Sequence, residues 1–171
     1  MVPPMKGEQE VIELLNEVLT HELTAINQYF IHSKMCKDWG FDRIAKHKWD
    51  ESIEEMRHAD KVIERILFLE GTPNMQRMNP VQVGEDAIEQ HELDLGLELE
   101  ALERLRKGID LCRDKKDTGT RELLEHILQE EEEGVDWLET LLRSPLVIPG
   151  VTTVRWADAS APTSSPSGRA T

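Results

Sequence analysis

The stretch ESIEEMRHADKVIERILFLEGTPN, residues 51–74, decides the fold. Its apolar residues recur at steps of three and four, which is the period of an amphipathic α-helix. The inward ones are Val62, Ile66 and Leu69. Glu55 and His58 continue this stripe as a Glu-x-x-His pair, so both side chains share one helix face. The glycine and proline within 71–73 end the helix.

The same helical period returns in three other segments, and no segment alternates apolar and polar residues over a useful strand length. The predicted helices run from about Gln9 to Lys37, Phe41 to Glu70, Glu85 to Arg113 and Thr120 to Arg143. The N-cap of the last helix is predicted at Thr118 or Thr120. The first and last links are short, whereas the link 71–84 is long enough to cross the bundle. This order predicts an all-α, ferritin-like antiparallel four-helix bundle with one long crossover.

Three regions follow one another along the chain. Residues 1–8 form an N-terminal extension, residues 9–143 form the bundle, and residues 144–171 form a tail. Pro145 and Pro149 prevent a continuous helix in the tail, and its end is rich in Ala, Ser, Thr and Pro. We expect the tail to be irregular or disordered.

Length and charge exclude several classes of protein. The chain of 171 residues carries a formal net charge of −14, which argues against nucleic acid and anionic membranes as partners. It has no run of about 18 apolar residues, as a membrane span requires, and no apolar signal segment at its start. Cys36 and Cys112 are isolated, which indicates free thiols and a cytoplasmic location.

Each predicted helix carries a carboxylate on a face that is otherwise apolar. These residues are Glu22, Glu55, Glu98 and Glu131. Buried carboxylates repel one another, and few inward lysines or arginines stand ready to neutralise them. Two metal ions would do so, because a glutamate from each of two helices plus Glu-x-x-His from the other two is the di-iron carboxylate arrangement. A single glutamate is ordinarily a solvated residue; the alignment of four favours a metal site.

Three stretches resemble bacterioferritin. They are HELTAINQYFIHSKMCKDWGF at 21–41, the stretch at 51–74, and EEEEGVDWLET at 130–140. The resemblance covers about residues 5–143. It implies an iron-storage subunit that oxidises Fe(II) to Fe(III) with dioxygen or peroxide. It also implies a large symmetric shell of such subunits, a 24-mer, in which the iron is stored, and a ferredoxin-like reductant for its release.

The resemblance also implies the site. The catalytic and metal-binding residues would be Glu22, Glu55, His58, Glu98 and Glu131. Glu55 and Glu131 match the bridging ligands, and Tyr29 matches a tyrosine that orients the centre. Met56 matches the residue that binds haem b at the twofold interface, one methionine from each subunit. It lies in a second apolar stripe of its helix, which by itself indicates a subunit contact.

The chain departs from the family in three places. Gly134 stands three residues after Glu131, where the family has a histidine, so one iron lacks its nitrogen ligand. Glu130 or water would have to replace it. Asp50 and Glu54 replace a histidine and an aspartate that face the cavity. The tail takes the place of the short fifth helix. Residues 144–171 are expected to dock a partner or thread through a pore of the shell, because their segment 151–156 is too apolar for a pure linker.

Four functions are compatible with these observations. The first is a ferroxidase-competent iron-storage subunit. The second is a catalytically weak, haem-binding structural subunit that co-assembles with a complete bacterioferritin subunit, as Gly134 suggests. The third is another di-iron enzyme, an oxygenase or a peroxidase, which would need a substrate channel. The fourth is a metal-free helical adaptor, against which Glu22 and Glu98 among apolar residues argue.

Overall fold

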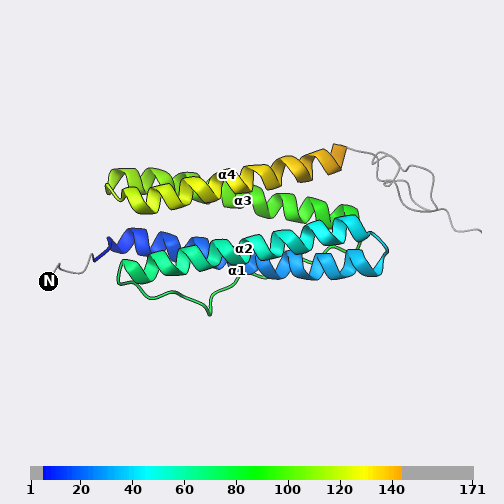
Figure 1. The fold of residues 1–171 in the computed structure, drawn as a ribbon, viewed down its shortest axis with the longest axis horizontal. Helices are drawn as coiled ribbons and strands as arrows, with labels where there is room; N and C mark the ends of the chain where they lie inside the picture. Colours follow the sequence, from blue (N-terminus) through cyan, green and yellow to red (C-terminus); the bar gives the residue numbers. More distant parts are fainter. Residues whose placement is uncertain (1–5, 144–171) are drawn as a thin grey trace, which may run out of the picture.

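Four antiparallel helices make up the regular structure of the computed structural model, which describes residues 6–143. They are α1 (Gln9–Asp38), α2 (Asp42–Phe68), α3 (Ala87–Asp114) and α4 (Thr118–Arg143). The α1–α2 hairpin lies against the α3–α4 hairpin, and the α2–α3 link runs along the bundle (Figure 1). The predicted all-α bundle with one long crossover is confirmed. The predictions for residues 1–5 and for the tail 144–171, including the missing fifth helix, lie outside the described residues.

The helix ends follow local chemistry. Gly40 adopts a φ of 86°, and this left-handed conformation closes α1 where the sequence predicted an end. The Asp86 carboxylate caps α3 by accepting hydrogen bonds from two backbone N–H groups. The predicted cap of α4 is wrong by a residue or more. The Asp117 carboxylate takes the capping role instead, since it accepts a hydrogen bond from the Thr120 N–H at 3.0 Å. The same carboxylate binds Arg65 of α2, which holds it at the start of α4.

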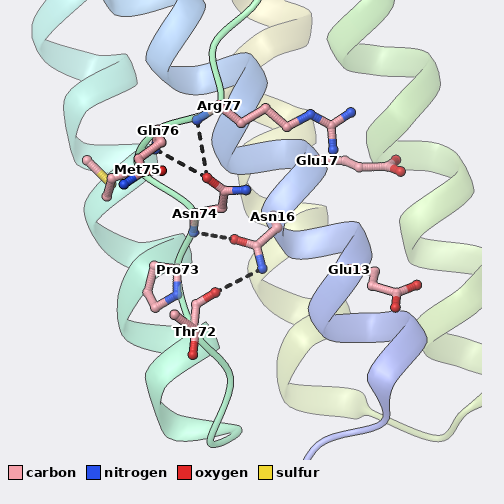
Figure 2. A pocket seen from close by; sticks show the side chains of 9 residues that line it. All are labelled: Glu13, Asn16, Glu17, Thr72, Pro73, Asn74, Met75, Gln76 and Arg77. Carbon is pink, nitrogen blue, oxygen red and sulfur yellow. Dashed lines mark hydrogen bonds between the residues drawn. The ribbon is translucent and has the colours of Figure 1, made fainter.

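The crossover is held to α1 along most of its course. Four polar side chains of α1 form hydrogen bonds with its backbone: Asn16, Thr24, Gln28 and His32. At the first of these, Asn16 accepts a hydrogen bond from the Asn74 N–H at 2.7 Å and donates one to the Thr72 carbonyl at 3.2 Å (Figure 2). At the last, the Gly84 N–H donates to His32 Nε2 at 3.1 Å. These bonds satisfy backbone groups that lack partners within a helix.

The core divides into an apolar half and a polar half. The apolar half lies where α1 begins, and it is filled by Val11, Leu15, Val62, Ile66, Leu105, Leu124 and Ile127. Glutamate, histidine, lysine and aspartate side chains are buried in the middle and the other half. None of the four helices in the described part of the chain is long and apolar enough to cross a membrane.

The predicted second apolar stripe on α2 faces outward. Trp49, Ile53, Met56 and Leu67 are exposed, whereas Ile63 of the same stripe packs against the core. On α1, Ile12 and Leu19 belong to the core, whereas Phe30 is exposed. The difference arises because α2 and the start of the crossover pack on the first half of α1, where Gly71 lies against Ile12 and Asn16 binds the Thr72 carbonyl.

Candidate metal centre

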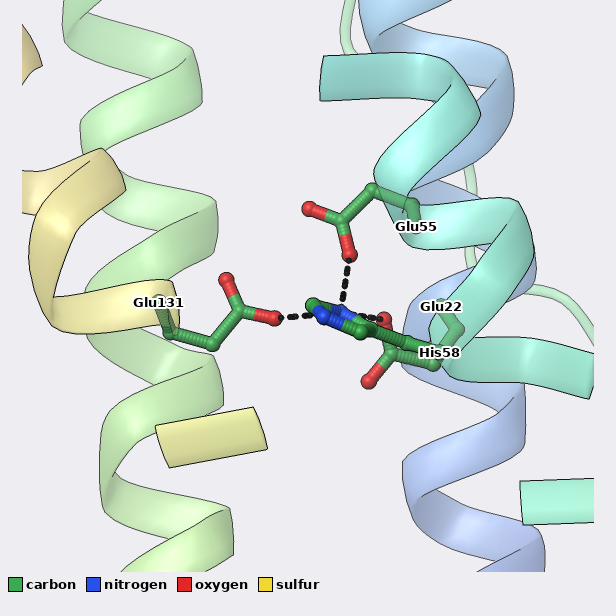
Figure 3. Close-up of side chains that lie close together, drawn as sticks. All are labelled: Glu22, Glu55, His58 and Glu131. Atoms are coloured by element: carbon green, nitrogen blue, oxygen red, sulfur yellow. Dashed lines mark hydrogen bonds and ion pairs between the residues drawn. The ribbon is translucent and has the colours of Figure 1, made fainter. Parts of the chain in front are cut away.

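The centre of the bundle gathers side chains from three helices at one point. They are Glu22 of α1, Glu55 and His58 of α2, and Glu131 of α4 (Figure 3). One ligand atom of each lies within 4.8 Å of the others, and no residue of the four is more than 4% exposed. The local cause is helical spacing, since each residue continues an apolar stripe of its own helix. The structure thus brings together four of the five ligands predicted from the sequence.

His58 lies in the middle of this group. Its Nδ1 atom is 3.1 Å from Glu55 Oε2, 3.2 Å from Glu131 Oε1 and 3.8 Å from Glu22 Oε2. Its Nε2 atom faces the other way and lies 2.9 Å from Glu130 Oε2. This contact with Glu130 fixes the orientation of the imidazole ring, so that Nδ1 faces the carboxylates. Partners of metal-binding histidines commonly act in this way.

The fifth predicted ligand, Glu98 of α3, lies beside this group. It is almost fully buried and accepts a hydrogen bond from the hydroxyl of Tyr29. Burial and the neighbouring charge of Glu131 raise the pKa of Glu98 well above its usual range. Through this hydrogen bond Tyr29 orients Glu98. The resemblance implied such a role for Tyr29.

The electrostatics of the centre favour a bound cation. Burial and the charge of Glu22 raise the pKa of Glu55, and burial with the charge of Glu55 raises that of Glu131 to about 7. Burial lowers the pKa of His58, but the neighbouring carboxylates of Glu131, Glu22 and Glu55 outweigh it and raise the pKa far above its usual range. Glu22 Oε2 is buried without a hydrogen bond. Oxygen and imidazole donors of this kind suit iron or manganese.

A pocket of about 230 Å³ opens from this centre toward Gly134. Besides the ligands, it is lined by His47 and Glu51 of α2 and by Trp137 of α4. The ring centroids of His47 and Trp137 are 3.5 Å apart. Burial lowers the pKa of His47 to about 4, and burial with the charge of Glu54 raises that of Glu51 to about 7.

A buried ion pair braces the polar half of the core. Lys48 Nζ binds Asp94, and both side chains have no exposed surface. Asp94 also lies 2.8 Å from His32 Nδ1 and accepts a hydrogen bond from Gln28 Nε2 at 2.9 Å. Burial raises the pKa of Asp94, but Lys48 and then His32 reverse this and lower it.

The sequence interpretation missed the roles of His47, Lys48 and Glu51. A signal was present, because Lys48 precedes Ser52 and Glu55 by four and seven residues and so shares their face. Glu130 reaches His58 because a glutamate side chain has three rotatable bonds.

Met56 lies apart from this centre on the outer face of α2. Its side chain is 52% exposed, next to the exposed Ile53 one turn earlier. The structure therefore places it where a second subunit could approach, and not within the bundle.

Comparison with known proteins identifies the family. A family model for the ferritin-like domain matches residues 12–145. The bacterioferritin of Mycobacterium bovis is 52% identical over 138 residues, which cover 81% of this chain and 87% of that protein. That of Streptomyces coelicolor is 49% identical over 138 residues, which cover 81% of this chain and 83% of that one.

A solved structure agrees with these relatives. The Mycobacterium tuberculosis bacterioferritin BfrA superimposes with a TM-score of 0.80 at 52% identity, over 81% of this chain and 87% of that chain. The range matched by the family model, residues 12–145, includes nearly all of the four helices. The chain therefore belongs to the bacterioferritin family of ferritin-like proteins.

Proposed function

We propose that the chain is an iron-storage subunit that binds Fe(II) as its substrate within the bundle and oxidises it to Fe(III). The observation that carries this proposal is the convergence of Glu22, Glu55, His58 and Glu131 in a buried group with ligand atoms within 4.8 Å. Four buried carboxylates without a cation cost free energy, and two iron ions remove that cost. A metal-free helical adaptor would bury these carboxylates without any cation to offset the cost.

The predicted ligands would bind iron at two positions. Glu22 and His58 Nδ1 would hold the first iron, and Glu98 would hold the second. Glu55 and Glu131 would lie between the two irons and bind both. Dioxygen or peroxide, taken up from solution, would accept the electrons released by Fe(II). Tyr29 and Glu130 hold Glu98 and His58 in position.

The outer face of α2 would form the contact with a second subunit. Its exposed apolar residues are too many for a helix facing water. We propose that Met56 binds haem b there, together with the same residue of a twofold-related subunit. We further propose a 24-subunit shell in the cytoplasm from which a ferredoxin-like reductant releases iron. The relatives carry the name bacterioferritin, which supports an assembly of like subunits.

A second function is favoured by Gly134. Glycine offers no ligand, so this chain would be a catalytically weak, haem-binding subunit that assembles with a complete one. The two functions differ in the rate of iron oxidation by the chain alone. They share storage of iron in a shell.

Stopped-flow oxidation of Fe(II) under air, on the purified chain alone, separates them. A fast phase that saturates near two irons per subunit is the expected result for a working centre. Glu55→Gln should abolish it, and Glu64→Gln, an exposed glutamate of the same helix, should leave it unchanged. Slow oxidation that never saturates, equal in the unmodified chain and in Glu55→Gln, would reject ferroxidase activity and favour the structural subunit.

A further inference from the structure

The space beside Gly134 is the place where this chain departs most from a complete centre. A Cβ atom added at Gly134 would lie 3.8 Å from Glu51 Oε2 and 4.0 Å from the carboxyl carbon of Glu98. A side chain from α4 would therefore project between these two carboxylates. Glycine leaves that space open, and Glu51 of α2 borders it.

Two side chains of α2 stand on that side. Glu51 directs Oε2 toward Gly134, and its other oxygen, Oε1, lies 3.2 Å from His47 Nε2. The spacing of four residues places both on one face of α2. His47 Nε2 is buried, and apart from this contact with Glu51 it has no hydrogen-bond partner among the described residues.

Trp137 fixes the imidazole of His47. The ring centroids are 3.5 Å apart with an angle of 31° between the ring planes, and Trp137 lies one turn after Gly134 on α4. His47 is thus packed against the same turn of α4 from which the family ligand would project. His47 therefore places an imidazole of α2 beside Gly134, the position at which α4 has no histidine.

We infer that His47 and Glu51 of α2 complete the second iron position in place of the histidine that Gly134 lacks. This inference rests on the proposed function, because it assumes that Glu98 holds the second iron. The replacement supplies one imidazole and one carboxylate, donors that suit iron. The ligand has moved from one helix to the helix packed beside it.

Glu130, the replacement considered from sequence, serves the other side of the centre. Its Oε2 is 2.9 Å from His58 Nε2, and it groups with Glu54 rather than with Glu98. His126 on the same helix lies 3.5 Å from the other oxygen of Glu130 and is exposed. Glu130 lines the same pocket as His47 and Glu51, but its two oxygens face His58 and His126, whereas Glu51 directs Oε2 toward Gly134.

Cobalt(II) binding tests the inference without relying on oxidation. Co(II) prefers nitrogen and oxygen donors and reports its ligands by visible absorption, and calorimetric titration gives the number bound. We expect two Co(II) per subunit in the unmodified chain. His47→Ala and Glu51→Gln should each weaken the second Co(II) by at least about tenfold and leave the first unchanged. Lys46→Ala, an exposed neighbour, should change neither.

Restoring the lost histidine provides the second measurement. Gly134→His in the His47→Ala background should recover the second Co(II) and its absorption band, because the space at Gly134 accepts a Cβ at ordinary contact distances. Recovery supports the assignment. If His47→Ala weakens the second Co(II) and Gly134→His does not restore it, His47 acts elsewhere and the inference is overturned.

The inference and the proposed function fail in different ways. Two Co(II) bound with equal affinity in the unmodified chain, His47→Ala and Glu51→Gln would overturn the inference and leave the proposed centre intact. A single Co(II), removed by His58→Ala, with a second appearing only in Gly134→His, would also overturn it. A chain that binds no Co(II) at all would reject the proposed centre itself.

Discussion

Replacing Lys48 with methionine should destabilise the bundle by leaving the Asp94 carboxylate buried without its cation. Lys48 and Asp94 have no exposed surface, so water does not screen the carboxylate that remains. Breaking a buried pair in this way costs about 3–5 kcal/mol. Asp94 keeps two partners, His32 at 2.8 Å and Gln28 at 2.9 Å, so we expect the lower end, about 3 kcal/mol.

The assay is thermal unfolding followed by far-ultraviolet circular dichroism at one protein concentration, since assembly also affects stability. For a chain of this size the loss corresponds to roughly 6–12 °C in Tm. Lys46→Met is the matched control, because Lys46 and Asp50 form an exposed pair worth about 0–1 kcal/mol. Adding Asp94→Asn to Lys48→Met should recover most of the loss, because the buried charge is then gone.

The pH dependence of this variant has a definite sign. The pKa of Asp94 is lowered from its ordinary value of 3.8, so the pair contributes stability above that pH and loses it as the pH falls. The deficit of Lys48→Met should therefore be largest at neutral pH and shrink below about pH 4. A Tm for Lys48→Met equal to that of Lys46→Met at neutral pH would refute the reasoning.

Three further predictions concern other positions. Gly134→Ala should raise the free energy of unfolding by about 1 kcal/mol in urea titrations, as Gly96→Ala should on α3, because both glycines lie within helices with room for a methyl group; a loss of stability would contradict this. His91 is buried with Nε2 unpaired, and burial lowers its pKa to about 4, so the unfolded chain binds the proton first as pH falls below 6.5. His91→Leu should remove about 3 kcal/mol of acid destabilisation between pH 6.5 and 4, and an unchanged profile would count against it. Co(II) should raise the Tm of the unmodified chain more than that of Glu22→Gln, read by calorimetry, because the variant loses a ligand of the first position. An equal rise in both would exclude Glu22 as a ligand.

Much of the bundle is encoded locally. The inward stripes of α1 and α3, with Glu22 and Glu98 in them, follow from the helical period alone, and the structure buries both residues. The lengths of the three links predict which helices are antiparallel neighbours, because a short link cannot cross the bundle. The cap of α4 was harder to predict, since Asp117, Thr118 and Thr120 are all good capping residues.

Long polar side chains could not be placed by this kind of reasoning. Lys48 shares a face with Glu55, yet a lysine ordinarily extends its amino group to water. It is buried here because Asp94 approaches from α3. Glu130 turns to His58 for a similar reason, since a partner on another helix selects its rotamer.

By itself, the sequence determined the four helices, their connectivity and the inward carboxylates, because each follows from spacing along one chain. The resemblance added that Gly134 stands where the family has a histidine. Only the tertiary structure decided which groups face Gly134. The meeting of Glu51, Glu98 and Gly134 depends on the axial register of α2, α3 and α4, which packing of whole helices sets. Helical period fixes the face on which a residue lies, and it carries no information about what lies opposite.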